Sequence, residues 1–316
     1  MVDWSPVGSF PPMNDMDWSK EFEKYSHSPE FIYINSHFTV SDFKQIFWLE
    51  YIHRFLGRTI GVVFMLPFFY FFIRKMFPKR FVPKMLILLF LGAIQGLVGW
   101  LMVKSGLVKN PHVSHYRLTL HLIIAFTVLG FTFWYALDLL YPYCNPGKNK
   151  KLKRLTIILL SVIILQIIYG AFVAGLKAGY LYPTYPKMGD RWIPEEVHGQ
   201  LSPMWKNFVQ GQAGVQFVHR CLALVVLFFS VFLFLKIKST LQIPLQRKLI
   251  TWLVVVVSIQ FILGITTITL GVPIFAAIAH QVGAFLLFCI TIFLIHGFSH
   301  GGINYENNKN DMINPL

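Results

Sequence analysis

Four histidines lie inside long apolar segments of this chain and form two matching sets. Each set contains a histidine, a glutamine and a second histidine, at His53, Gln95 and His121 and again at His219, Gln260 and His280. Equivalent members are 166, 165 and 159 residues apart, and this near-constant spacing indicates an internal duplication. Imidazoles are costly inside a bilayer and mark functional sites there, and two per repeat are what bis-histidine ligation of a heme iron requires.

The depth of these histidines favours one pair in each half. His53 lies one to two helical turns into a span expected at 46–73, and the other three lie within about two turns of the same side of the membrane. At equal depth, His53 and His121 can face one planar ligand, and His219 and His280 can face another. For any one of them, a hydrogen bond to a neighbouring helix is the alternative.

Glu50 distinguishes the two sets. It precedes His53 by three residues, so both side chains project from one helix face, whereas the equivalent position of the second set is the neutral Gln216. A carboxylate at membrane depth is expensive and rarely without function. The difference predicts chemistry in the first half, with Glu50 as the candidate catalytic residue, and cofactor binding in the second. The alternative for Glu50 is a salt bridge with Arg54 or another arginine.

Three arginines accompany the histidines at the same level. Arg54 and Arg220 each directly follow a histidine of these sets, and Arg117 precedes another by one helical turn. Guanidinium groups bind carboxylates through paired hydrogen bonds, and a heme carries two propionates, so all three are candidate propionate-binding residues. The alternative, snorkelling to the membrane interface, fits Arg117 well.

Gln95 and Gln260 lie near the middle of their spans beside glycines, Gly99 and Gly264 among them. Small residues let helices approach closely, and a glutamine inside a membrane typically forms a hydrogen bond across a helix interface. We therefore expect structural roles for both glutamines.

The composition is that of a membrane protein. Of the 316 residues, 55% are hydrophobic and only 13% are charged, and the mean hydropathy is +0.57; soluble domains have about 25% charged residues. A span needs roughly 20 apolar residues. Seven segments meet this requirement, at 46–73, 85–103, 118–141, 155–176, 215–235, 249–270 and 272–295. The predicted fold class is an all-α polytopic membrane protein with two pseudo-symmetric helix bundles.

The net charge of +14 is concentrated in short connections between spans. Residues 74–84 and 148–154 each hold five lysines or arginines, and residues 236–248 hold four. These connections alternate with less basic ones, as the positive-inside rule predicts for cytoplasmic loops. We therefore interpret the charge as a signal of topology in a lipid bilayer and exclude nucleic acid as a partner. The ends of the spans that carry the four histidines then face away from the cytoplasm.

The cysteines and the other histidines show no comparable pattern. Cys144, Cys221 and Cys289 lie far apart and outside the predicted outer loops, so no disulfide is expected. Solvated or interfacial positions are expected for the seven remaining histidines, which are His27, His37, His112, His115, His198, His296 and His300.

The two halves differ by one helix. The second half has four expected spans, beginning with 155–176, whereas the first has three and opens in an acidic loop with no span or signal peptide ahead of it. We therefore expect that a first span is missing and that the chain begins at an internal methionine; a true seven-helix variant is the alternative. The expected organisation is an N-terminal half-bundle at 1–142, a cytoplasmic linker at 143–154, a C-terminal half-bundle at 155–298 and a cytoplasmic tail at 299–316.

Several motifs together resemble the heme A synthase family, over residues 1 to about 296. They are Glu50-Tyr51-Ile52-His53-Arg54, residues 95–107 beginning Gln95-Gly96-Leu97-Val98-Gly99, residues 116–121, residues 170–179, residues 185–189, Gln216-Phe217-Val218-His219-Arg220 and Ala279-His280-Gln281. The resemblance is to the branch found in mitochondria and many Gram-negative bacteria, because the other branch has a cysteine pair in an outer loop and this sequence has none. It implies eight spans in two four-helix halves, one span more than the sequence contains.

The resemblance also implies a reaction, the oxidation of a ring methyl of heme O to the formyl group of heme A for terminal oxidases. In family terms, His53 and His121 bind the substrate heme O and Glu50 is the essential acid. His219 and His280 bind a heme b cofactor. The implied location is the bacterial inner membrane, or the mitochondrial inner membrane in a eukaryote. Implied partners are heme O synthase, cytochrome oxidase assembly factors and further copies of the chain.

Two other functions remain open from the residues alone. A diheme b-type electron-transfer protein needs the same histidine pairs but has no need for the difference between Glu50 and Gln216. A heme carrier that presents heme to an oxidase does not need two ligated sites with unequal surroundings.

Overall fold

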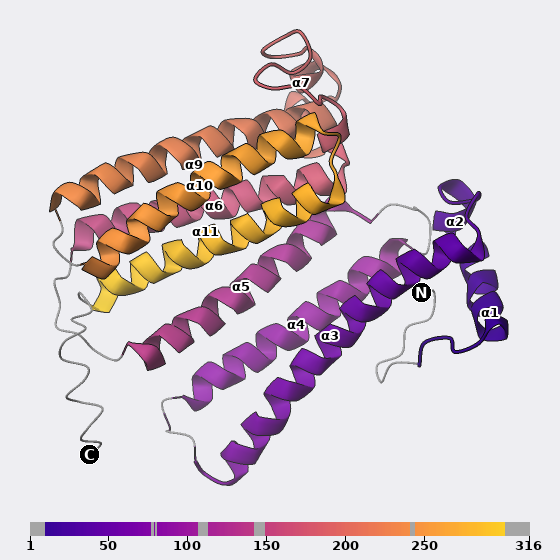
Figure 1. The fold of residues 1–316 in the computed structure, drawn as a ribbon, viewed down its shortest axis with the longest axis horizontal. Helices are drawn as coiled ribbons and strands as arrows, with labels where there is room; N and C mark the ends of the chain where they lie inside the picture. The colour runs from indigo at the N-terminus through magenta and orange to yellow at the C-terminus, as the bar shows by residue number, and fades with distance from the viewer. Residues whose placement is uncertain are drawn as a thin grey trace. The chain divides into compact units, whose positions relative to one another are not determined.

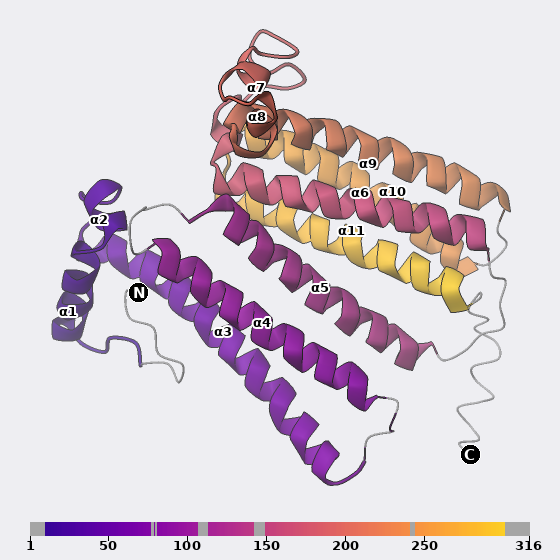
Figure 2. The same cartoon turned by 180° about the vertical axis from the view of Figure 1, so that it is seen from behind.

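The computed structural model describes residues 10–76, 79, 81–106, 113–141, 149–240 and 244–300. Within these residues all regular structure is helical, and seven helices are long and apolar enough to cross a membrane (Figure 1, Figure 2). They are α3 (Val40–Ile73), α4 (Val82–Gly106), α5 (His115–Leu140), α6 (Lys150–Gly175), α9 (Gln212–Thr240), α10 (Pro244–Thr269) and α11 (Ile274–His300). Each of the seven expected spans falls on one of them. The predicted class, an all-α polytopic membrane protein, is confirmed.

Some of the expectations fall on parts of the chain outside the described residues. These parts include the first nine residues, the first half of the linker expected at 143–154 and nearly all of the tail expected at 299–316. Cys144 and His112 also lie outside the described residues, as does the side chain of His300.

The chain divides into two compact units, Met1–Ile124 and Ala125–Leu316, and the division falls inside α5. In the second unit, α6 and α10 each pack against both α9 and α11, so these four helices form a bundle (Figure 1). Apolar side chains from all four helices fill its interior, including Leu159, Ile163, Leu233, Leu253 and Leu294. Close packing of this kind is what holds helices together in lipid, where burial from water contributes little. The predicted outer bounds of the two half-bundles stay a prediction.

The part of α5 within the second unit packs along α11. Gly130 makes this approach close, because a Cβ atom there would lie 3.4 Å from both Phe288 and Ile292. Phe126 meets Phe288 edge to face, with ring centroids 5.1 Å apart. A contact between Asp138 of α5 and His296 of α11 joins the ends of the two helices that the charge pattern predicts to be cytoplasmic.

The first unit contains α3 and α4, which pack against each other, and two short helices, α1 (Asp15–Ser26) and α2 (Pro29–Tyr33). An aromatic cluster joins α1 to the start of α3, with Trp18 stacked edge-on against Phe47 at 5.0 Å between ring centroids. Thr39 and Asp42 form a reciprocal capping box that starts α3 at Val40.

This early start of α3 changes the position of His53 within its helix. The sequence placed His53 one to two turns from a span beginning at residue 46, whereas it lies more than three turns from the first residue of the helix, Val40. The additional turns are not a longer apolar span. They carry Phe43 and Phe47, which are buried against α1, and thus extend the helix into the N-terminal segment.

The connection between α6 and α9 is long but ordered by one buried side chain. It contains the 3-10 turns η1 (Ala178–Tyr180) and η2 (Met204–Lys206) and the short helices α7 (Glu196–Gly199) and α8 (Asn207–Gln210). The fully buried Asn207 donates to the carbonyls of His198, Leu201 and Met204 at 2.9, 2.9 and 3.0 Å. A Cβ atom on Gly214 of α9 would collide with the Asn207 carbonyl, so glycine is required there for this loop to dock.

Candidate functional site

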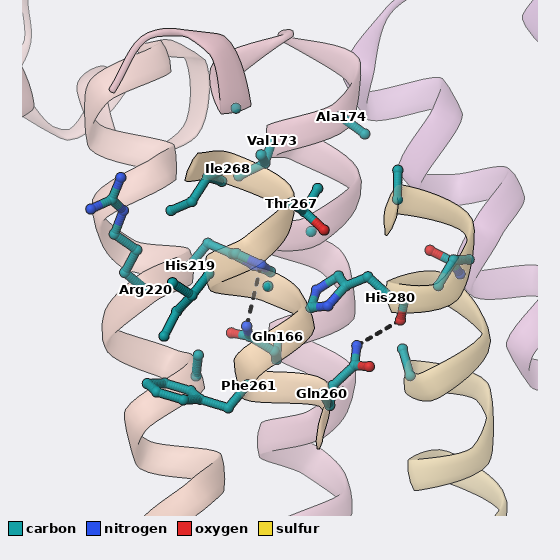
Figure 3. Close-up of a pocket in the computed structure, with 18 of the residues that line it drawn as sticks. Gln166, Val173, Ala174, His219, Arg220, Gln260, Phe261, Thr267, Ile268 and His280 are labelled. Carbon is teal, nitrogen blue, oxygen red and sulfur yellow. Dashed lines mark hydrogen bonds between the residues drawn. The ribbon is translucent and has the colours of Figure 1, made fainter. Parts of the chain in front are cut away.

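The C-terminal bundle encloses a cavity of about 600 Å³, lined by residues of α6, α9, α10 and α11. His219 from α9 and His280 from α11 both line it, and Figure 3 shows their rings approaching each other across the cavity. The two imidazoles are close enough to interact electrostatically. The structure therefore brings together the two histidines that the sequence paired in the second half, in a cavity of the size that ligand sites usually have.

Each of these imidazoles lies against a glycine of a neighbouring helix. A Cβ atom on Gly170 of α6 would lie 3.2 Å from Cε1 of His219, and one on Gly264 of α10 would lie 3.0 Å from Cε1 of His280. Gln166 of α6 places its amide nitrogen 3.4 Å from Nε2 of His219. The expected structural role of Gln260 is confirmed, because its amide donates to the backbone carbonyl of His280 at 2.6 Å (Figure 3).

The donor atoms of this cavity fit a bound heme. The Nδ1 atoms of His219 and His280 are buried, and no described residue provides a hydrogen-bond partner for either. Unpartnered buried nitrogens are costly, and two imidazole nitrogens facing one cavity are the donor set that a bis-histidine heme site would require. Aliphatic residues such as Ile163, Val257 and Leu287 supply the apolar walls that a porphyrin needs.

The loop between α6 and α9 contributes Tyr180 and Tyr185 to the roof of this site, and the carbonyl of Tyr182 in the same loop binds two side chains of α9. This carbonyl accepts hydrogen bonds from Gln216 at 3.2 Å and from Nη2 of Arg220 at 2.8 Å. Arg220 also donates from Nη1 to the carbonyl of Lys187 at 3.3 Å, while its buried Nε has no partner among the described residues. Arg220 thus lines the cavity with its guanidinium tied mainly to the loop, which leaves Nε as the donor for a carboxylate.

In the first unit, His53 and His121 are also close enough to interact electrostatically. His121 has surroundings like those of the C-terminal histidines, because a Cβ atom on Gly99 would lie 2.9 Å from its Cε1. Gln95 of α4 places its amide nitrogen 3.3 Å from Nε2 of His121, so the hydrogen bond expected across a helix interface is present here too. His53 differs from the other three, since its side chain is exposed.

Glu50 forms an ion pair with Arg54, one helical turn along α3. This is the alternative that the sequence left open, and it does not remove Glu50 from the site, because Glu50 and His53 share a face of α3. Arg54 is 11% exposed and Glu50 is 33% exposed, so the pair lies partly within the protein. Arg117, which is exposed, donates to the carbonyl of Leu101 at 3.4 Å.

A second electrostatic cluster lies in the loop between α6 and α9. The Tyr182 hydroxyl donates to Glu196 at 3.1 Å, and Arg191 pairs with Glu195 at 2.6 Å. A hydrogen bond from its own backbone N–H, followed by that from Tyr182, lowers the pKa of the Glu196 carboxyl below its ordinary value. Burial and the neighbouring Glu196 raise the pKa of Tyr182.

The structure corrects the expectation for His296. It was expected at a solvated or interfacial position, but it is 1% exposed, and its Nε2 lies 3.0 Å from Oδ1 of Asp138 on α5. The ring of Trp134 covers it edge to face at 5.0 Å between centroids. An acid contributed by another helix, far away in the chain, has no sequence signature, which is why the pair could not be predicted. By contrast, His27, His37 and His198 are exposed, as expected.

Comparison with known proteins places this arrangement in a family. A family model described as "Cytochrome oxidase assembly protein" matches residues 1–292. The chain belongs to this family. It is 43% identical over 303 residues to a protein named heme A synthase from Flavobacterium johnsoniae, covering 95% of this chain and 89% of that one. Proteins of the same name from Flavobacterium psychrophilum and Nitrosospira multiformis are 44% and 41% identical, covering 95% and 94% of this chain and 89% and 84% of theirs.

For this member of the family, the main contacts that the sequence did not predict are those of Gln166 and Gly170 with His219. A signal for them was present. Gln166 precedes Gly170 by four residues, as Gln95 precedes Gly99 and Gln260 precedes Gly264. The three pairs follow one pattern, and each faces a histidine of the two sets.

Proposed function

We propose that this protein is a heme A synthase, a membrane oxidoreductase that converts heme O to heme A. The observation that carries the proposal is the presence of two histidine sites with unequal surroundings, with Glu50 beside one and Gln216 beside the other. Relatives that bear this name, at 41–44% identity over nearly the whole chain, support it. A purely electron-transferring diheme protein has no need for such inequality.

The C-terminal site is the cofactor site in this proposal. His219 and His280 hold a heme b within the cavity, and Nε of Arg220 is available to a propionate. When bound, heme b supplies one-electron redox chemistry. The protein's own part is to fix the two imidazoles on separate helices and to surround them with apolar side chains that exclude water.

The N-terminal site takes heme O as substrate. His53 and His121 are the axial ligands, and Arg54 and Arg117 are the candidate partners of its propionates. Arg54 has five N–H donors in a planar fork, so it can keep its ion pair with Glu50 and still reach a second carboxylate.

Glu50 is the reactive group of the N-terminal site. Oxidation of a methyl carbon makes that carbon electron-poor, and a fixed carboxylate nearby stabilises the developing positive charge. The same carboxylate can instead take the proton of a water molecule that attacks this carbon. In either role the ion pair with Arg54 holds Glu50 in one orientation on the face of α3 that also carries His53.

We further propose a bacterial inner membrane location, since the similar relatives described above are bacterial. The basic connections then lie in the cytoplasm and the four histidines near the opposite surface. The expected half-bundles at 1–142 and 155–298 correspond to the substrate site and the cofactor site.

One experiment tests the function. The protein is expressed in a host that makes heme O but no heme A, and the extracted hemes are separated by chromatography. We expect heme A or its hydroxymethyl precursor, and neither from a His53→Ala/His121→Ala control. An electron-transfer protein would leave heme O unchanged while binding heme b, and a carrier would retain unmodified heme O. Either result would overturn the proposal.

A further inference from the structure

Three helices each present a glutamine and a glycine, one helical turn apart, to a histidine on the next membrane-spanning helix. The pairs are Gln95 and Gly99 on α4, Gln166 and Gly170 on α6, and Gln260 and Gly264 on α10. Residues four apart lie on the same face of a helix, so the two side-chain positions of each pair address one neighbour. That neighbour is His121, His219 and His280 respectively.

At these three positions the helix backbone lies so close to the imidazole that any residue other than glycine would displace the ring. A Cβ atom would approach Cε1 of the ring to 2.9 Å at Gly99, 3.0 Å at Gly264 and 3.2 Å at Gly170. All three distances are shorter than ordinary van der Waals contact between carbons. Gly96, on the same helix as Gly99, faces open space, because a Cβ atom there would have no neighbouring atom within 4 Å. The close fit is therefore a property of particular glycines and not of glycine in these helices generally.

The glutamines act at two different points. The amides of Gln95 and Gln166 each place a terminal atom 3.3 and 3.4 Å from Nε2 of their histidines. With the amide oxygen, which has no partner among the described residues, accepting from Nε2–H, Nδ1 is left to bind iron and the bond restrains the rotation of the ring. Gln260 donates to the backbone carbonyl of His280 at 2.6 Å and thus restrains the helix and not the ring. Within the C-terminal cavity, one histidine is held by its ring and the other by its main chain.

We propose that these three glutamine–glycine pairs are positioning elements that hold the imidazoles of His121, His219 and His280 in place. The inference rests on the proposed function, in which these imidazoles bind heme iron. The glycine sets how far each ring stands from its neighbouring helix, and Gln95 and Gln166 set the angle of two of the rings. Groups that orient a metal-binding histidine typically change metal affinity or activity by about 10- to 100-fold when removed.

The C-terminal cavity gives the sharper test, because its resident heme b can be followed without turnover. The variants are Gly264→Ala, Gly170→Ala and Gln166→Leu, purified with bound heme. Gly96→Ala is the matched control, since it makes the same substitution in a spanning helix at a position that faces open space. The readouts are heme b content, the low-spin electron paramagnetic resonance signal of the ferric protein and the midpoint potential.

We expect Gly264→Ala to shift the resonance signal and the potential and to weaken heme retention about 10-fold. Gly170→Ala should shift them less, because its contact is longer. Gln166→Leu should broaden the resonance signal because the ring of His219 is no longer held at one angle, and Gln166→Asn should restore only part of the wild-type signal. The Gly96→Ala protein should match the wild type. If the alanine variants do not accumulate, Gln166→Leu alone decides the outcome.

The result that overturns this inference differs from the one that overturns the proposed function. Wild-type signals in Gly264→Ala, Gly170→Ala and Gln166→Leu, together with loss of heme b in His219→Ala, would show that the pairs do not position the ligands. Retention of heme b in His219→Ala would instead remove the ligand assignment on which the proposed function depends.

Discussion

The two histidine sites differ at one pair of equivalent positions, and the side chains at these positions make different contacts. In the first unit Glu50 and Arg54 pair with each other on α3. In the second, Gln216 and Arg220 occupy the equivalent positions and both donate to the carbonyl of Tyr182. A carboxylate has no hydrogen to donate, whereas an amide has two, so a loop carbonyl can be held by glutamine but not by ionised glutamate.

This difference shows how a duplicated scaffold can give two functions. At position 216 the amide is 1% exposed and its N–H serves to fix the roof of a cavity. At position 50 the glutamate side chain is one-third exposed and pairs with the arginine of its own helix. The second site therefore has no carboxylate beside its histidines, as suits a permanently bound cofactor. The first site keeps an acidic group near the position where we place the substrate.

The largest expected effect comes from removing a ligand, and it differs between the halves. His219→Ala or His280→Ala should abolish the heme b absorption spectrum and all heme A formation, since both histidines line the one cavity. His53→Ala or His121→Ala should leave that spectrum in place and abolish turnover of heme O. Optical spectra of the purified proteins and analysis of extracted hemes provide both measurements. Loss of resident heme b from the His53→Ala protein, with retention in His219→Ala, would reverse the assignment of the halves.

Exchanging the residues that distinguish the halves should have the next largest effect. Glu50→Gln keeps size but removes the charge, so we expect heme A formation to fall by about 10²- to 10⁴-fold, as for the loss of a general acid or base. Bound heme b should stay at the wild-type level. Turnover is measured from the ratio of heme A to heme O in cells. Turnover at the wild-type rate would exclude Glu50 from the reaction.

The converse change, Gln216→Glu, serves as the matched control. This substitution removes the hydrogen bond that Gln216 donates to the Tyr182 carbonyl, and it places a carboxylate at a buried position. Arg220 lies one turn away and can pair with the new carboxylate, as Arg54 does with Glu50. We expect weaker retention of heme b and no gain of activity at the second site.

The sequence predicted the features that depend on the type of single residues, on the length of apolar segments and on the spacing of the internal repeat. The seven spans, the pairing of His219 with His280 in one cavity and the structural role of Gln95 and Gln260 follow from hydropathy, spacing and residue type. Contacts that depend on the exact rotation of two helices could not be predicted in this way. The bond between Asp138 and His296 and the docking of Arg220 on loop carbonyls are of this kind. Their partners lie 158 residues apart in the first case and 38 in the second.

The smallest predicted effect concerns pH and should be confined to the second site, because the loop between α6 and α9 forms its roof. The pKa of Glu196 is lowered in the folded loop, so the bond that its carboxylate accepts from Tyr182 stabilises the loop above the ordinary pKa of glutamate, about 4.3. That stability is lost as the pH falls through the lowered pKa. The carbonyl of the same Tyr182 holds Gln216 and Arg220. Amide hydrogen exchange in residues 182–190, corrected for the intrinsic pH dependence of exchange, should therefore accelerate as the pH falls from the ordinary pKa of glutamate through the lowered one. Glu196→Gln should remove this pH dependence, and Tyr182→Phe should reproduce the faster exchange at neutral pH while keeping the carbonyl. Equal acceleration in the wild type and in Glu196→Gln would show that another group controls the loop.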